Sequence, residues 1–252
     1  GLFIGFMLLC GLATIRLPAP QIGDTEPFLQ NLKRLSTKPA WLGFLVAIFL
    51  VGISTSFIHN YYVLYITDMG GSESLYGLSV AAAGLSELPV FFFAGRLVRR
   101  FTARGLLVIG FVAFALRTLL ISMIPSPDWA VVPQLLHGLS FSALWTAGVV
   151  YVAQMTPPGL GATAQSAFGV TLFGFAGAVG GVFGAHLYET AGPVVMYRVA
   201  ALTAVLGLCC FLVVEFHSRR TRLAEVTPAR PDQADTSAFD LDAEDTESLI
   251  GS

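Results

Sequence analysis

Residues 40–66 read AWLGFLVAIFLVGISTSFIHNYYVLYI, and this stretch contains no Asp, Glu, Lys or Arg. An α-helix rises about 1.5 Å per residue, so roughly 20 apolar residues cross the hydrocarbon core of a bilayer. The stretch is long enough and apolar enough to do so. Because lipid offers no water to backbone polar groups, a helix is the conformation that satisfies them. We therefore predict a transmembrane helix over 40–66.

Further stretches have the same character, and they cover approximately 75–94, 105–124, 129–155, 164–188 and 193–216. Turn-rich connectors such as Met69-Gly70-Gly71-Ser72 separate them. The apolar segment 1–15 is too short to span a bilayer, and we expect it to be the end of a truncated helix. The sequence thus predicts an all-α polytopic membrane protein. Its parts are the truncated helix 1–15, a cytoplasmic loop 16–39, a six-helix bundle 40–216 and a disordered cytoplasmic tail 217–252.

Composition favours an integral membrane protein and excludes several other classes. Only 12% of the residues are charged, whereas a soluble domain carries about 25%. The net charge of -2 gives no indication of a nucleic-acid partner, and the three cysteines form no disulfide framework. Phosphate-binding loops, G-x-S-x-G elbows and zinc-spaced His/Cys clusters are absent from the sequence. We therefore expect no enzymatic activity, no cofactor and no bound metal.

Lysine and arginine are distributed asymmetrically. The segments 16–39, 95–104 and 217–252 contain all of them except Arg117 and Arg198. These three segments lie on the same side of the membrane if the predicted helices alternate in direction. Loops rich in Lys and Arg stay in the cytoplasm, so we expect a cytoplasmic tail. As a separate expectation, the protein lies in the plasma membrane.

The loop after the second helix of the bundle reads GRLVRRFTAR, residues 95–104. Four positions match the signature G-x-L-x-D-R-x-G-R-R: Gly95, Leu97, Arg100 and Arg104. Arg99 replaces the acidic residue, and Thr102 replaces the second glycine. With the long loop before the bundle, this match makes the chain resemble the major facilitator superfamily. The resemblance implies that the chain is the second half of a transporter, and that its partner is a missing N-terminal six-helix half. It also implies a gating loop formed by Gly95, Arg99, Arg100 and Arg104.

Two shorter stretches resemble the branch that contains phenylpropionate permeases and the lactose and nucleoside proton symporters. They are Glu87-Leu88-Pro89 and Leu136-His137-Gly138-Leu139-Ser140-Phe141, the second continuing to Pro157-Pro158-Gly159-Leu160-Gly161-Ala162-Thr163-Ala164-Gln165. Symporters of this kind carry a carboxylate, an arginine and a histidine on three successive helices, and Glu87, Arg117 and His137 stand in that order here. The resemblance implies a role in proton coupling for all three. Ser140 stands where that branch has a glutamate, so the proton step is not carried over whole.

Physical reasoning singles out the same ionisable residues. A charge at the bilayer centre costs about 2.5–3.5 kcal/mol, so such side chains face a bundle interior or a wet cavity. At about 1.5 Å per residue, Glu87, Arg117 and His137 fall roughly 12–18 Å from a membrane surface, within one central layer. A carboxyl group that is alternately desolvated and beside a cation can bind and release a proton. We therefore expect Glu87 to carry the proton, the alternative being a plain ion pair that fixes helix packing.

One helix face carries polar and aromatic residues at spacings of three and four, namely Gln134, His137, Phe141 and Trp145. Such a face is typical of a substrate-binding wall, or of a buried His and Gln that bond to neighbouring helices. His59 and Asn60 end a similar polar stripe and are further candidates for substrate binding. The tyrosines that follow are expected in the interfacial aromatic belt, at positions 61, 62 and 65.

Small residues in the fifth predicted helix repeat at G-x-x-x-G spacing, as Gly177 with Gly181 and Gly180 with Gly184. This spacing predicts close packing of another helix. A sliding surface for alternating access is the more specific hypothesis from the same residues.

These observations lead to two hypotheses from different classes. The first is secondary active transport of a small organic solute, as proton symport by alternating access, with solute, protons and the lipid bilayer as partners. The second is a transporter-like membrane receptor or scaffold without transport activity. An intramembrane enzyme that uses His137 lacks a paired nucleophile.

Overall fold

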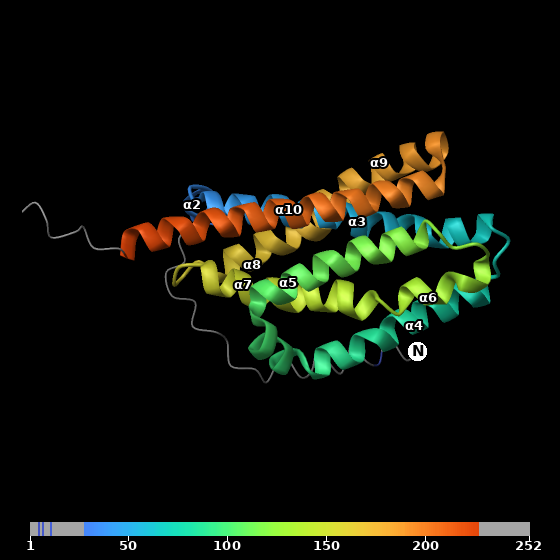
Figure 1. Ribbon diagram of the computed structural model, residues 1–252, viewed down its shortest axis with the longest axis horizontal. Helices are drawn as coiled ribbons and strands as arrows, with labels where there is room; N and C mark the ends of the chain where they lie inside the picture. The colour runs from blue at the N-terminus through green and yellow to red at the C-terminus, as the bar shows by residue number, and fades with distance from the viewer. Residues whose placement is uncertain (1–4, 6, 8–10, 12–27, 227–252) are drawn as a thin grey trace, which may run out of the picture.

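The computed structural model describes residues 5, 7, 11 and 28–226. Within that part the chain is helical apart from short turns, and the long helices run roughly along one common axis (Figure 1). The predictions for the remainder of 1–15, for 16–27 and for the tail from 227 onward lie outside the described residues. The fold class predicted from the sequence, an all-α polytopic bundle, is confirmed.

Among the described residues, six helical spans are long and apolar enough to cross a membrane. Two of the spans contain a π-helical turn, so they are divided into shorter elements. The spans are formed by α3 (Pro39–Asp68), α4 (Glu73–Phe92), α5 (Ala94–Ile121), η1 (Pro127–Ala130) with α6 (Val131–Gln134), η2 (Gly138–Ser142) and α7 (Ala143–Met155), α8 (Gly161–Gly169) with η3 (Val170–Phe175) and α9 (Ala176–Ala191), and α10 (Pro193–Val226). A further helix, α2 (Phe28–Ser36), precedes them.

The helices extend further than the hydropathy pattern alone predicts. α5 begins at Ala94 and so includes the whole segment 95–104, which was predicted to be a loop, although its backbone is not helical at Thr102. α10 continues to Val226, beyond the predicted end at 216, and α2 lies within the predicted linker. Arginine and lysine are good helix formers, so a helix can continue past the apolar span into a basic segment. Hydropathy reports the membrane-spanning part of a helix and not its full length.

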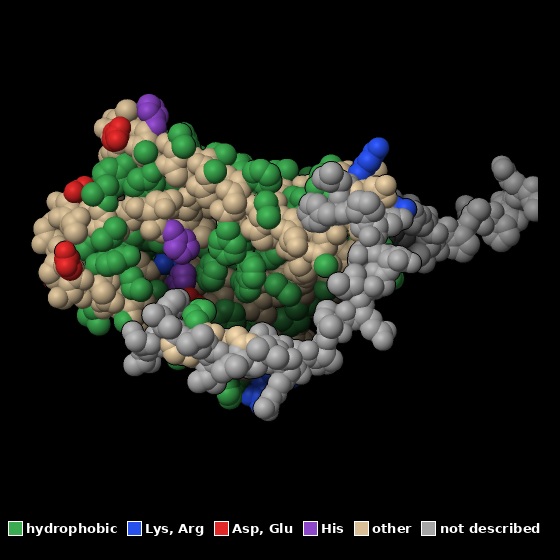
Figure 2. Space-filling view, turned by 180° about the vertical axis from the view of Figure 1, so that it is seen from behind, with side chains coloured by type: hydrophobic (Ala, Val, Ile, Leu, Met, Phe, Trp, Pro, Cys, Tyr) green, Lys and Arg blue, Asp and Glu red, His purple; other side chains and the backbone are tan. Residues whose placement is uncertain are grey.

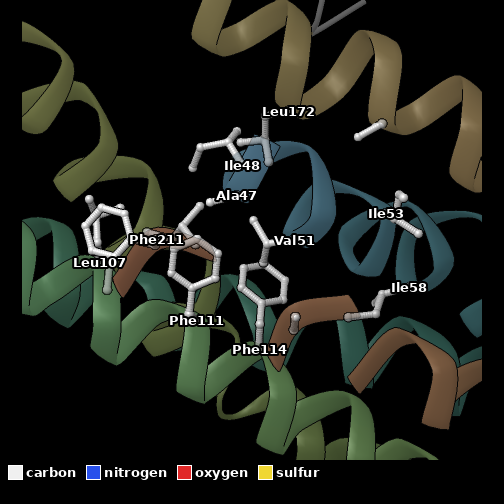
Figure 3. Packing of buried hydrophobic residues seen from close by; sticks show 14 of the residues in the cluster. Ala47, Ile48, Val51, Ile53, Ile58, Leu107, Phe111, Phe114, Leu172 and Phe211 are labelled. Atoms are coloured by element: carbon white, nitrogen blue, oxygen red, sulfur yellow. The ribbon is translucent and has the colours of Figure 1, made fainter. Parts of the chain in front are cut away.

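The hydrophobic core lies around α3, which packs against α5, α9 and α10. Figure 3 shows Leu107, Phe111 and Phe114 of α5 directed towards Ala47 and Val51 of α3. All five side chains are buried. By contrast, only Ser79 and Ala83 of α4 are buried, and this helix lies at the edge of the bundle beside α6 (Figure 1). The structure therefore leaves α4 with an open face.

Glycines permit the close approach of α9 to α3. A Cβ atom on Gly180 would lie 2.7 Å from Cβ of Ser56, and one on Gly184 would meet the Tyr61 ring. Gly177 and Gly181 serve differently, because their carbonyl groups accept hydrogen bonds from Ser56 and Tyr61. α9 thus contacts α3 through both missing side chains and exposed carbonyls.

A strained residue interrupts α5 near its start. Thr102 has φ 61° and ψ 162°, a backbone conformation that is essentially reserved for glycine and costs about 1–3 kcal/mol for other residues. Its Oγ1 accepts a hydrogen bond from the Gly105 N–H at 3.3 Å, which caps the helix that follows. Thr102 is also the position at which the loop signature carries glycine. The backbone conformation at this position therefore explains why the signature has a glycine there.

We expect Thr102→Gly to raise the free energy of unfolding by about 1 kcal/mol, because it removes the strain and glycine itself costs only a few tenths as a cap. The matched control is Thr102→Ala, which loses the hydroxyl cap and keeps the strained Cβ, and which should be no more stable than the native chain. Thermal unfolding in detergent, followed by circular dichroism, measures both. Equal stability of the Gly and Ala variants would contradict the strain.

Candidate functional site

The helix that carries His137 departs from regular geometry next to that residue. Pro133 in α6 has no backbone N–H, and the chain forms turns at residues 135–136 before the π-helical turn η2 begins at Gly138. The Gly138 N–H donates to Oγ of Ser86 in α4, at 2.9 Å, instead of to its own helix. A Cβ on Gly138 would collide with the Ser86 carbonyl oxygen. Glycine here therefore brings two backbones together where Glu87 and His137 must meet.

Four side chains from three of the spans form one continuous hydrogen-bonded cluster. Nη1 of Arg117 lies 2.6 Å from Nδ1 of His137, and Nη2 of Arg117 donates to Oε1 of Gln134. On the other side of the imidazole ring, Nε2 of His137 lies 2.7 Å from Oε1 of Glu87. Arg117 and Gln134 are only 2% and 3% exposed. We call these four residues the polar cluster.

The direction of the hydrogen bonds in the polar cluster follows from the chemistry of its members. A guanidinium group has donors and no acceptor, so Nδ1 of His137 accepts from Arg117 and carries no proton. The single proton of the ring is then on Nε2, which donates to the Glu87 carboxylate. The imidazole is neutral in this arrangement, and it stands between a cation and an anion.

The polar cluster borders a cavity of about 170 Å³ between α3, α4, α5 and η2. Arg117, Gln134 and His137 line it from one side, and His59 lines it from α3. His59 also lines a second cavity of about 370 Å³, on the side of η3 and α9. Figure 2 shows the hollow on this face, with histidine side chains in it and a basic and an acidic side chain beside them.

The other predicted substrate-binding residues fall into different environments. The Phe141 ring stacks on the His137 imidazole, with ring centroids 5.3 Å apart, and lines the first cavity. Asn60 lines the second cavity and donates to Oγ of Ser56. Trp145 packs on Phe168 and Phe173. The structure therefore brings Phe141 to the polar cluster and gives Trp145 aromatic neighbours on the adjacent span.

Some residues of the site were missed or placed elsewhere by the sequence analysis. Tyr62 was expected at the membrane interface, but it is 3% exposed, lines the first cavity and donates to the Ala130 carbonyl. Tyr65 is likewise buried, against Tyr197. A tyrosine near the end of an apolar run fits either an interface or a buried acceptor, and only the neighbouring helices decide between them. Tyr76 and Ser86 gave no signal beyond their presence in a predicted helix.

One residue of the predicted gating loop, Arg104, forms an ion pair with α10. Nε of Arg104 lies 2.8 Å from Oε1 of Glu215, and the hydroxyl of Tyr151 donates to the other oxygen of that carboxylate. Arg100 lies over the Phe101 ring, and the nearest contact of a Cβ on Gly95 would be the Arg99 guanidinium. Arg104 thereby connects the start of α5 to the end of the last span.

In the part of the chain that the structure describes, a helical bundle with six apolar spans and a buried polar cluster between them defines a multi-pass integral membrane protein. Residues 13–199 match the profile of the MFS_1 like family, and the chain belongs to that family within the major facilitator superfamily. The narrower likeness to phenylpropionate permeases and to the lactose and nucleoside proton symporters is not supported.

The relatives are named as major facilitator superfamily domain-containing protein 6-like proteins. The Xenopus laevis protein A is 28% identical over 68% of this chain and 28% of its own length. The Homo sapiens protein is 26% identical over 87% of this chain and 39% of its own length, and the Mus musculus protein is 27% identical over 84% and 37%. The chain therefore spans less than half the length of these relatives.

The contact between Gly138 and α4 can be tested with a single methyl group. Gly138→Ala should destabilise the protein by about 1–3 kcal/mol, because the methyl forces α4 away from η2. Gly84→Ala in α4 is the control, since a Cβ there meets nothing within 4 Å and alanine is the better helix former. Thermal unfolding of both variants in detergent gives the comparison. A Gly138→Ala protein as stable as Gly84→Ala would contradict this close approach.

Proposed function

We propose that this chain is the second six-helix half of a secondary transporter, which moves a small organic solute together with protons by alternating access. Membership of the MFS_1 like family supports transport as the general activity. The observation that carries the proton-coupled form is the direct chain of contacts from Arg117 through His137 to Glu87.

The hydrogen bonds of the polar cluster make it sensitive to one additional proton. If His137 gains a proton on Nδ1, that nitrogen can no longer accept from Arg117. If Glu87 gains a proton and donates a hydrogen bond to Nε2, that nitrogen must accept, so the ring proton moves to Nδ1. Nδ1 then again cannot accept from Arg117. In either case the Arg117–His137 contact breaks. Proton binding is thereby linked to the position of Arg117, which lines the cavity.

The polar cluster also joins the elements that alternating access would move. Glu87 belongs to α4, Arg117 to α5, and His137 precedes η2. Because α4 is the least buried span, breaking the contacts with His137 would release it more easily than the others. π-helical turns are frequent at functional sites, and η2 lies directly beside this cluster. We infer that α4 and η2 change their relative position during the cycle.

The proposal also includes the missing half of the transporter and the orientation of the chain in the membrane. The other partner is an N-terminal six-helix half, which would close the cavity from the open side. The basic segments near Arg99, Arg104 and Arg220 would face the cytoplasm, in accordance with the charge asymmetry of the sequence, and the protein would reside in the plasma membrane. Gly95, Arg99, Arg100 and Arg104 would then gate the cytoplasmic side, and the glycines of α9 would allow small movements against α3.

Glu87→Gln in the full-length protein should lower concentrative solute uptake tenfold or more, because an amide can neither bind the proton nor stabilise a protonated His137 ring. The assay is uptake of a panel of small organic solutes into proteoliposomes with an alkaline interior. The matched control is Glu73→Gln, an exposed residue in the first turn of the same helix, which should transport like the native protein.

Two results would count against this proposal. Concentrative uptake that survives in Glu87→Gln would remove Glu87 from the proton pathway and leave the polar cluster as a packing element. Failure of the native protein to move any solute, together with binding of a partner protein, would favour the receptor or scaffold hypothesis.

A further inference from the structure

The two cavities beside the polar cluster have an unbalanced charge. Of the described residues that line them, Arg117 is the one permanently charged side chain, and the others are neutral or are the imidazoles of His59 and His137. The Glu87 carboxylate lies on the far side of the His137 ring, where it accepts from Nε2. A molecule inside the cavity can therefore contact the Arg117 guanidinium directly, whereas the His137 ring separates it from the Glu87 carboxylate.

Arg117 is held by neutral partners although it is buried. Its two terminal nitrogens contact His137 and Gln134, and within the described part of the chain its Nε has no hydrogen-bond partner. A charge taken out of water is costly unless an opposite charge and full hydrogen bonding compensate it. The site thus has an unfilled donor and an incompletely compensated positive charge in one side chain.

The rest of the first cavity is suited to an apolar group. Aromatic rings from four elements line it, namely Tyr62, Tyr76, Phe114 and Phe141. Binding sites for small organic molecules commonly combine such an apolar wall with a few well-placed polar groups. Arg117 and Gln134 are the polar groups at this wall.

We propose that the solute is a small organic anion, whose carboxylate binds Arg117 and whose apolar body lies against these rings. This inference rests on the proposed function and names its substrate class. Guanidinium and carboxylate form charge-assisted, commonly bidentate hydrogen bonds, which a neutral solute cannot match. The anion supplies a negative charge that compensates Arg117, which the neutral Gln134 and His137 side chains cannot do.

Anion binding and proton binding then support each other. A carboxylate that takes Nη1 of Arg117 leaves Nδ1 of His137 without its donor, and this nitrogen becomes free to accept a proton. The titratable and charged groups that face His137 are Glu87 from α4, Arg117 from α5 and His59 from α3. A protonated ring remains bonded to the Glu87 carboxylate through Nε2. One anion and one proton bind together, so the net charge of the occupied site does not change.

The experiment measures binding to the purified full-length protein by isothermal titration calorimetry, with benzoate, hexanoate and the amide of each acid as probes. At least one carboxylate should bind ten or more times tighter than its own amide. Arg117→Gln should remove that preference, and Arg117→Lys, which keeps the charge, should retain it at reduced affinity. Arg198→Gln, at an exposed residue of α10, is the control and should bind like the native protein. Equal binding of acids and amides, or no binding of any acid, would overturn the assignment.

A second readout separates this inference from the proposed function. The same titrations in buffers of different ionisation enthalpy should show about one proton taken up per carboxylate bound, and none in the His137→Asn variant. Carboxylate binding without proton uptake would overturn the linkage between anion and proton. Proton-driven uptake of a neutral solute that persists in Arg117→Gln would overturn the anion site and leave proton-coupled transport intact.

Discussion

The donation from Arg117 to Nδ1 of His137 is the contact on which the rest of the site depends. Because the guanidinium group cannot accept, this contact determines the tautomer of the ring, and the tautomer in turn determines that Glu87 is an acceptor. A buried cation and a carboxylate are thus connected without touching each other. The arrangement leaves the cation facing the cavity, which an ordinary Arg–Glu ion pair would not do.

The fold meets the cost of this arrangement with specific backbone features. Gly138 and Ser86 bring the backbones of η2 and α4 together, and Oγ of Ser86 accepts the N–H of Gly138, which follows the turns at residues 135–136. The opposite wall is firmer, because α3 is packed on α5, α9 and α10 and contributes His59 and Tyr62 to the cavity. The tightly packed helix α3 therefore faces the lightly packed α4 and η2 across the cavity. The polar cluster joins α4 to the span that contains η2.

Much of the site could be predicted because charge in an apolar segment is conspicuous. Glu87, Arg117 and His137 were identified from their depth in three successive spans, and Gln134 and Phe141 from their spacing on one helix face. Tyr62 was assigned to the membrane interface instead, since its hydroxyl bonds to a carbonyl 68 residues away that no local pattern reveals. The role of Ser86 was likewise invisible, because a serine in a membrane helix usually bonds to its own backbone.

The sequence by itself determined that this chain is a bundle of membrane-spanning helices, because the hydrophobic effect acts on the average composition of about 20 consecutive residues and needs no knowledge of neighbours. It also singled out the ionisable residues that lie within those helices. Only the tertiary structure decided that the ring of His137 separates Arg117 from Glu87, and that the cation rather than the carboxylate lines the cavity. These features depend on how each helix is rotated about its axis and on the direction of individual hydrogen bonds. The hydropathy of a segment contains no information about either.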